Sequence, residues 1–383
     1  MQGKLAELRR RIARIDRKYA AKITAAPAPP ITFPPPRPHQ YFPEEWLHGE
    51  SIEDEYGRHF ETERLWERHR RHGSIGISDL QDLPPDSLAA IADAAIPNAP
   101  PHKWAFLDTE TAGLAGGAGS CAFLVGVGRI DSEGFRLRHF FMRDFSEESS
   151  VLHALAQYLA QFDVLVTYNG KTYDQPLLEN RYAALGMVPP FCRLAHFDLL
   201  AGARRLWKLR FGGCRLVQLE NRILGVEREG DLPGELIPYV YFEYLRTREA
   251  FRLLPIFHHN AIDILSLACL TAVASRAYRD DTSLASGAEM AGVARWLLRS
   301  GRRERALRLL YGAVDCGLRD DLLFRALWDI AALEKKLGNK DRAIAVLQDL
   351  ALSPNAYQFA AQDKLAKFTR SASKKRAGHR SGR

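Results

Sequence analysis

Four carboxylates and a histidine lie in three separate motifs, each at the edge of an apolar segment. Asp108 and Glu110 form the first motif, Asp174 ends the second, and His259 and Asp263 belong to the third. Hard divalent cations such as Mg2+ prefer carboxylate oxygens. Two such ions, about 4 Å apart, activate a water and stabilise the leaving oxygen of an in-line displacement. These residue types therefore predict a two-metal site for phosphodiester cleavage, with two Mg2+ (or Mn2+) ions as cofactors.

The spacing of the first motif strengthens this interpretation. Asp108 and Glu110 are two residues apart at the end of the apolar run 104–107, so on a strand they point to one face. Two charges placed there are costly unless cations neutralise them. The alternative is a structural pair of acids held by salt bridges.

The third motif offers two candidate histidines. His259 and Asp263 are four residues apart and share one face of a helix, whereas His258 would share that face only if it preceded the helix. We favour His259 because its spacing requires no helix distortion. A histidine with a pKa of about 6.5 can accept a proton from a metal-bound water at neutral pH.

The second motif, 168–174, also contains Asn169 and Lys171 directly after an apolar segment. From such a loop both side chains could reach a substrate phosphate. The alternative is that the asparagine only caps the turn.

Hydrophobic patterning predicts the elements that must position these motifs. Strands are predicted at 104–109, 121–130, 135–141, 163–167 and 191–197, and helices at 147–161, from 174 onward and at 199–209. The order βββαβαβα predicts an α/β fold with a mixed five-stranded sheet and flanking helices. Asp108 and Asp174 then fall at the carboxyl ends of neighbouring strands, the edge at which α/β sheets build their sites.

Composition divides the rest of the chain. Residues 1–38 are predicted to be a basic helix followed by a proline-rich linker, residues 39–100 have no assigned role and include the charged segment 61–71, and the catalytic region spans 101–280. Residues 284–369 are predicted to be all-helical. Within them, 300–307 match 337–344 at an offset of 37, which indicates tetratricopeptide-like repeats with a usual period of about 34. The alternative is a plain helical domain. Residues 370–383 form a basic tail that is expected to be disordered.

The net charge of +8 resides at the two ends of the chain. Residues 1–24 hold eight Lys/Arg and two acids, and residues 371–383 hold five Lys/Arg and no acid, so the rest carries a net charge of −3. Such tails bind polyanions through counterion release, or they are only solvated ends.

Cysteine usage and hydropathy indicate in which cellular compartment the protein is expected. The five cysteines are scattered without Cys-x-x-Cys spacing, which argues against a disulfide framework and against a thiolate metal site. Residues 1–24 lack the apolar core of a signal peptide, and the longest mainly apolar run, 264–274, is too short to span a bilayer. We therefore expect a cytoplasmic protein without a membrane partner.

Taken together, the motifs resemble the DEDD 3′–5′ exonuclease superfamily within the ribonuclease H-like fold. The most similar branch is the bacterial YprB-like one, which is often joined to tetratricopeptide-type repeats. The resemblance covers about residues 100–275. It is carried by DTETAGL (108–114), YNGKTYD (168–174), LENRILG (219–225), DLPG (231–234) and HNAIDILSL (259–267).

The resemblance implies a role for each residue of the predicted site. Asp108 would bridge both metal ions, Glu110 and Asp263 would complete the shell of the first ion, and Asp174 would hold the second ion through water. His259 would orient or deprotonate the attacking water. The substrate-binding residues would be Thr111, Asn169 and Lys171, and the residues near the substrate channel would be Asp198, Arg204 and Arg205.

Two features depart from the usual pattern of that superfamily. Ala112 stands where a threonine is usual, which removes a hydroxyl near the nucleotide. Asp174 follows Asn169 by five residues rather than the common four. The loop of the second motif is therefore expected to differ from that of proofreading exonucleases.

We expect a metal-dependent nuclease, and specifically a DEDD-type 3′–5′ exonuclease that acts on single-stranded DNA or RNA. The repeats would offer a surface for a protein partner. One alternative is a nucleic-acid-binding scaffold with a catalytically weak nuclease fold, which would show no Mn2+-dependent thermal stabilisation. The other is an endonuclease on RNA–DNA hybrids or branched DNA, which would cut a circular substrate.

Overall fold

The computed structural model describes residues 43–92, 95–113 and 120–368. These residues form two compact units. The first unit takes in the described residues within 43–89, 95–198 and 220–270, and the second takes in those within 90–92, 199–219 and 271–368. The predicted basic helix and linker (1–38) and the predicted basic tail (370–383) lie outside the described residues.

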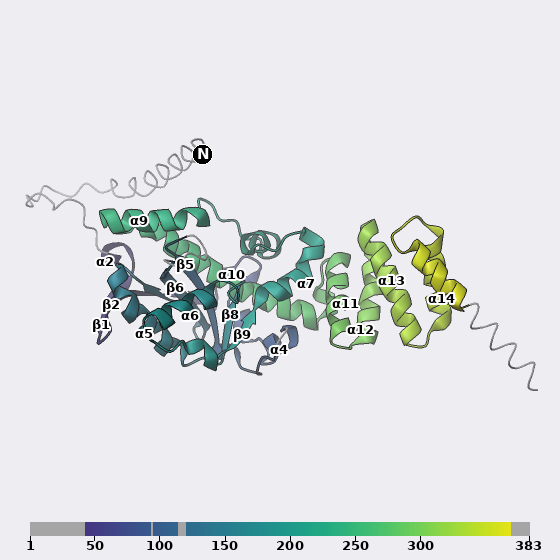
Figure 1. The fold of residues 1–383 in the computed structure, drawn as a ribbon, viewed down its shortest axis with the longest axis horizontal. Helices are drawn as coiled ribbons and strands as arrows, with labels where there is room; N and C mark the ends of the chain where they lie inside the picture. The colour runs from purple at the N-terminus through teal and green to yellow at the C-terminus, as the bar shows by residue number, and fades with distance from the viewer. Residues whose placement is uncertain (1–42, 93–94, 114–119, 369–383) are drawn as a thin grey trace, which may run out of the picture. The chain divides into compact units, whose positions relative to one another are not determined.

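A seven-stranded mixed sheet forms the centre of the first unit, in the order β1-β2-β7-β6-β5-β8-β9 (Figure 1). Strand β5 is antiparallel to β6 and parallel to β8, so the antiparallel and parallel parts of the sheet meet at β5. This arrangement confirms the predicted α/β fold class. The strands are Gly49–Asp54 (β1), Gly57–Glu67 (β2), Trp104–Thr111 (β5), Ala122–Ile130 (β6), Gly134–Phe141 (β7), Val164–Thr167 (β8) and Ala195–Asp198 (β9). A separate hairpin pairs Arg71–His72 (β3) with Ile75–Gly76 (β4).

The sheet has two more strands than the five predicted, because β1 and β2 come from the segment to which no role was assigned. Charged residues conceal the strand pattern of β2. Glu61 is only 5% exposed, and its carboxylate bonds to His59 Nε2 at 2.9 Å and to Arg138 Nε at 2.6 Å. Because these partners satisfy the buried charge, a segment with a charged sequence can form an inner strand of the sheet.

The predicted strand at 191–197 is shorter than expected. Its first part forms the 3-10 helix Pro190–Arg193 (η3), and β9 begins at Ala195. Proline lacks the backbone N–H that a ladder requires, so Pro190 favours this late start.

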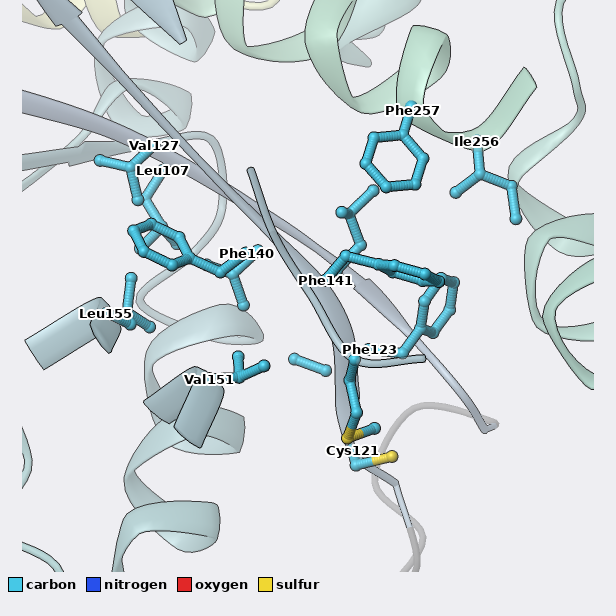
Figure 2. Close-up of a cluster of buried hydrophobic side chains, with 14 of the residues drawn as sticks. Leu107, Cys121, Phe123, Val127, Phe140, Phe141, Val151, Leu155, Ile256 and Phe257 are labelled. Atoms are coloured by element: carbon cyan, nitrogen blue, oxygen red, sulfur yellow. The ribbon is translucent and has the colours of Figure 1, made fainter. Parts of the chain in front are cut away.

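Helices cover both faces of the sheet. Side chains alternate along β7, so Phe140 points to one face and Phe141 to the other. Phe140 packs against Tyr158 of α5 (Glu148–Leu159) with ring centroids 5.6 Å apart, and Phe141 packs against Phe257 of α10 (Leu254–Arg279) at 5.2 Å. Figure 2 shows Val151 of α5 on the side of Phe140. Helix α5 therefore covers one face, and α10 covers the other.

The helices of the first unit are mostly short. They are Pro43–Trp46 (α2), Ser78–Gln81 (α3), Glu148–Leu159 (α5), Asp174–Ala184 (α6) and Ile237–Thr247 (α9), with 3-10 helices at Pro101–Lys103 (η1), Phe145–Glu147 (η2), Gly234–Leu236 (η5) and Ala250–Leu253 (η6) and a π-helix at Glu220–Leu224 (η4). Two helices contain residues of both units, namely Ser87–Ile91 (α4) and Leu254–Arg279 (α10).

Helix α10 is the longest helix among the described residues and contains the apolar run 264–274. With η6 before it, the stretch Ala250–Arg279 is long and apolar enough, by length and composition, to cross a membrane. In this structure 72% of its apolar window is buried. A core helix of this kind meets the same criteria, and α10 packs directly on the sheet.

The second unit is helical throughout the elements it contains in the described part of the chain. Its helices include Leu199–Phe211 (α7), Leu216–Leu219 (α8), Asp281–Ser283 (η7), Gly287–Arg299 (α11), Arg303–Asp315 (α12), Asp320–Lys336 (α13) and Lys340–Leu352 (α14). The sequence echo has a structural counterpart, because α12 and α14 begin 37 residues apart. Each follows a glycine with positive φ, 76° at Gly301 and 89° at Gly338. Glycine adopts this conformation without strain, so the same type of turn joins α11 to α12 and α13 to α14.

Candidate active site

Strand β5 carries the two acids of the first motif on the face that α10 covers. Asn260 of α10 donates from Nδ2 to Asp108 Oδ2 at 2.8 Å, and Glu110, two residues along the strand, is 8% exposed. Gly126 of β6 lies opposite Asp108. A Cβ at position 126 would lie closer to Asn260 Oδ1 than 3.0 Å, which real Cβ atoms essentially never do. The glycine therefore provides the space in which Asn260 reaches Asp108.

Helix α10 also supplies the histidine and the last acid. His259 and Asp263 lie on one helix face, with Nε2 3.6 Å from Asp263 Oδ2, and their side chains are 12% and 16% exposed. The other ring nitrogen of His259, Nδ1, hydrogen-bonds to Asp231 at 2.9 Å. His258 is exposed. Of the two candidate histidines, His259 is therefore the one that contacts the acids.

Asp174 is the first residue of α6 and reaches the same group of acids. Thr109, between the two acids of β5, donates its hydroxyl to Asp174 Oδ1 at 2.5 Å. Asp174 is 8% exposed, and its charge contributes to raising the pKa of Asp108. The three motifs therefore converge at one place, as the sequence predicts.

The loop before Asp174 is held by Asp198 at the end of β9. The carboxylate of Asp198 accepts the backbone N–H of Asn169 at 2.8 Å and that of Lys171 at 3.2 Å. Asn169 has a φ of 68°, a left-handed conformation that asparagine tolerates. The side chain of Lys171 is exposed in this arrangement. Asp198 therefore orders the loop through its backbone.

The remaining residues predicted to lie near the substrate belong to different units of the chain. Thr111 is the last residue of β5 and is half-buried, directly after Glu110. Arg204 and Arg205 belong to α7 of the second unit, where the Arg205 guanidinium lies 4.9 Å from the centre of the Trp296 ring.

Arg228, which the sequence did not suggest, links the last acid to a buried network. Its guanidinium bonds to Glu220 Oε1 at 2.7 Å, to Asp231 Oδ2 at 3.3 Å, and to Asp263. Glu220 is fully buried and also accepts the hydroxyl of Ser266 at 2.8 Å. Arg228 and Asp231 lie in a loop without periodicity, so only the tertiary structure reveals that they contact α10.

Burial and mutual repulsion raise the pKa values of the acids. Burial raises the pKa of Asp108 well above its usual value, and the charges of Asp263, Asp174 and Glu110 raise it further. Burial likewise raises the pKa of Glu110 to about 8 and that of Asp174 to about 6. The pKa of Asp263 is raised by burial and lowered in turn by His259 and Arg228. The positive charge near the four carboxylates is thus too small to neutralise them.

The pKa of His259 reflects the same imbalance. Burial lowers it, but the hydrogen bond to Asp231 and the charges of Asp263 and Glu110 raise it to about 9. In the metal-free arrangement His259 therefore carries a proton at neutral pH. Cations bound to the acids would oppose this effect, because they would neutralise the charges that raise the pKa.

The donor set fits hard divalent cations by chemistry. Four carboxylates that repel one another are the ligands that Mg2+ and Mn2+ prefer. Within the described residues no three or more His, Cys, Asp or Glu side chains are already arranged around a common metal position. Asn260, Thr109 and Arg228 instead hold the carboxylates of Asp108, Asp174 and Asp263. Cation binding at these acids would therefore require some of these contacts to rearrange.

Comparisons with known proteins give a family model, a relative and a solved structure to which this chain is similar. A family model described as the RNase_H superfamily matches residues 105–275. The chain is 30% identical over 326 residues to the uncharacterized protein YprB of Bacillus subtilis (strain 168), covering 83% of this chain and 77% of the relative. Among solved structures, the family B DNA polymerase of the hyperthermophilic archaeon Pyrobaculum calidifontis aligns with a TM-score of 0.36 and 18% identity. That alignment covers 52% of this chain and spans only 30% of the polymerase chain.

Proposed function

Because this chain belongs to the YprB family within the RNase H superfamily, we propose that it is a DEDD-type 3′–5′ exonuclease acting on single-stranded nucleic acid. Membership of the superfamily implies a nuclease-type hydrolase. One observation carries the proposal further: β5, α6 and α10 bring four carboxylates together beside one histidine. Burial raises the pKa values of all four carboxylates, and repulsion among them raises those of Asp108 and Glu110 further.

The proposed cofactors are two Mg2+ or Mn2+ ions. Asp108, Glu110, Asp174 and Asp263 would hold them, since carboxylate oxygens are the ligands that these ions prefer. When bound, the ions would supply an activated water and stabilise the departing 3′ oxygen. Thr109 and Asn260 keep Asp174 and Asp108 oriented through hydrogen bonds of 2.5 Å and 2.8 Å.

His259 is the proposed general base. Its Nδ1 is held by Asp231, and its Nε2 lies on the side of Asp263. An imidazole in this position can accept the proton of the attacking water at Nε2. The substrate-binding role is proposed for Thr111, Asn169 and Lys171; the exposed Lys171 ammonium supplies a charge for a backbone phosphate.

We also propose that α11–α14 are tetratricopeptide-like repeats that offer a surface to a protein partner. The support is the repeated turn, in which α12 and α14 begin after equivalent glycines. Helix pairs that recur at a fixed spacing are typical of such arrays. The proposed compartment is the cytoplasm.

The test uses the full chain with Mn2+ and 5′-labelled single-stranded DNA and RNA, alongside Asp108→Asn. We expect a ladder that shortens from the 3′ end, and we expect the variant to abolish it. The Asn side chain keeps an acceptor for Asn260 and removes one repelling charge, so the variant should be folded and at least as stable without metal. Glu229→Gln, an exposed acid on the loop of Arg228, should keep full activity.

Three results would contradict parts of the proposal. Retained cleavage in Asp108→Asn would exclude the acids as the catalytic group. Cleavage of a circular substrate would indicate an endonuclease. No cleavage of either strand, together with no Mn2+-dependent rise in melting temperature, would indicate the nucleic-acid-binding scaffold.

A further inference from the structure

The loop at 226–233 brings Asp231 to His259 and Arg228 to Asp263, and it is fixed at both ends. Before the loop, Glu220 of η4 is fully buried and bonds to Arg228. Near its end, Leu232 is 1% exposed and belongs to the hydrophobic core of the first unit. Asp231 lies between these two anchors. Its position is therefore set by the fold and does not depend on its own contact with His259.

Three donors converge on the Asp231 carboxylate. His259 Nδ1 lies 3.0 Å from Oδ1 and 2.9 Å from Oδ2, the backbone N–H of Leu232 donates to Oδ1 at 2.9 Å, and Arg228 Nη1 donates to Oδ2 at 3.3 Å. A carboxylate can only accept hydrogen bonds. The ring nitrogen that faces Asp231 must therefore be the protonated one.

The geometry of the ring then determines what Nε2 can do. With the Nδ1 proton committed to Asp231, the neutral ring presents an unprotonated Nε2 on the side of Asp263, 3.6 Å from Oδ2. A histidine free to rotate about its last torsion could instead present Nδ1, or carry its proton on Nε2. A carboxylate that accepts a hydrogen bond from one ring nitrogen prevents both the rotation of the ring and the shift of its proton to the other nitrogen.

We infer that Asp231 is a positioning residue that fixes the ring orientation and the tautomer of His259, so that Nε2 is the atom that receives a proton from the attacking water. This inference rests on the proposed function, because it assigns His259 a proton to accept. Asp231 itself touches neither the acids of β5 nor Asp174 in any described contact. It acts through His259 and is not a metal ligand.

The sharpest variant is Asp231→Asn, which changes hydrogen-bonding character and almost no volume. With its oxygen in the Oδ1 position, the Asn side chain can still accept from Leu232. Its NH2 group then takes the Oδ2 position, where it would donate to His259 Nδ1 and lose the long bond from Arg228. That reverses the tautomer and places the proton on Nε2. Asp231→Glu, which keeps an acceptor, is the second variant, and Glu229→Gln on the same loop is the matched control.

The first measurement is the side-chain 15N spectrum of the metal-free full chain, labelled at histidine, at a pH above the end of the His259 ring titration, which the same resonance reports. His259→Gln assigns the resonance. We expect protonated Nδ1 and bare Nε2 in the wild type and in Glu229→Gln, and the reverse in Asp231→Asn. Protonated Nδ1 in Asp231→Asn, or protonated Nε2 in the wild type, would overturn the inference.

The second measurement is steady-state cleavage of single-stranded substrate with Mn2+. Asp231→Asn should lower kcat by about 10²–10⁴-fold, the range that one general base supplies, with little change in KM, and Asp231→Glu should recover part of the loss. A reversed tautomer with unchanged kcat would overturn the inference. So would loss of Mn2+ binding measured by calorimetry, because Asp231 would then be a ligand.

Failure of the proposed function would look different. In that case the wild type would show no cleavage, while the 15N spectra would still show whether Asp231 sets the tautomer of His259. An inactive wild type with the expected tautomers would refute the nuclease and retain the positioning role in the metal-free protein. An active wild type with unchanged tautomers in the variants would do the opposite.

Discussion

Replacing Gly126 by alanine should disturb the site without touching any acid or histidine. Gly126 lies opposite Asp108 in the sheet and beneath Asn260 of α10. The added methyl group would come closer than 3.0 Å to Asn260 Oδ1 and to Ile264. Ile264 can shift its terminal methyl, but Asn260 is fully buried and has little space in which to move. The hydrogen bond from Asn260 to Asp108 should therefore break or lengthen.

The expected magnitude follows from two terms. Overpacking a core position by a methyl group costs about 1–3 kcal/mol. Losing a hydrogen bond to a charged group costs about 1.5–3 kcal/mol more. Gly126→Ala should thus lower the free energy of unfolding by about 2.5–6 kcal/mol. The energy of the lost hydrogen bond also estimates the transition-state stabilisation that is lost when Asp108 is no longer held in place. On that basis kcat/KM should fall about 10- to 100-fold.

Gly128→Ala is the matched control, because Gly128 lies two residues further along β6. A Cβ there would lie 2.7 Å from Ile264 Cγ2 and would press on Phe135, and Asn260 is not among its nearest neighbours. Urea denaturation of the metal-free proteins should show both variants destabilised, Gly126→Ala more strongly. Only Gly126→Ala should lose kcat/KM per folded molecule. Equal losses of activity in the two variants, or wild-type stability in Gly126→Ala, would refute the reasoning.

Two further predictions concern charge. Arg228→Met leaves Glu220 buried without its cation and should cost about 3–5 kcal/mol in urea denaturation. Arg246→Met, on an exposed pair, should leave stability unchanged, and similar losses in both would argue against a special role for Arg228. The pKa values of Glu110 and His259 are raised to about 8 and about 9, so between pH 6.5 and 9 the folded metal-free protein binds more protons than the unfolded chain. Its free energy of unfolding should fall as pH rises through this window, and the fall should be smaller with Mn2+. A urea midpoint that rises with pH instead would contradict the pKa assignment.

The sequence was sufficient wherever a motif and its element coincide. An apolar run ends at Asp108, and this run predicts strand β5. Side chains alternate along a strand, so Asp108 and Glu110 are predicted to point to the same face. The i and i+4 spacing of His259 and Asp263 places them on one helix face, and the structure has them 3.6 Å apart. The fold class follows from the order of such elements.

The contacts that hold the site together could not be predicted in this way. Asn260 reaches Asp108 across 152 residues, and Arg228 meets Asp263 across 35, from a loop with no periodicity. Such contacts depend on which face of α10 packs on the sheet and on the path of the loop, and neither leaves a local signal in the sequence. Strand β2 was hidden for a related reason, since the charge of Glu61 is satisfied by His59 and by Arg138 on a neighbouring strand.

Strand β2 is more than an addition to the edge of the sheet. Thr62, His139, Gly126 and Asp108 form one cross-strand row over β2, β7, β6 and β5. Thr62 bonds to His139 Nδ1 at 3.1 Å, and burial lowers the pKa of His139 to about 3. Without β2, His139 would lie on an edge strand, open to water and free to charge beneath α10. A charged imidazole there would press on the helix that carries Asn260, His259 and Asp263. Strand β2 therefore keeps the face of the sheet beneath α10 uncharged and packed, and α10 is the helix on which the site depends.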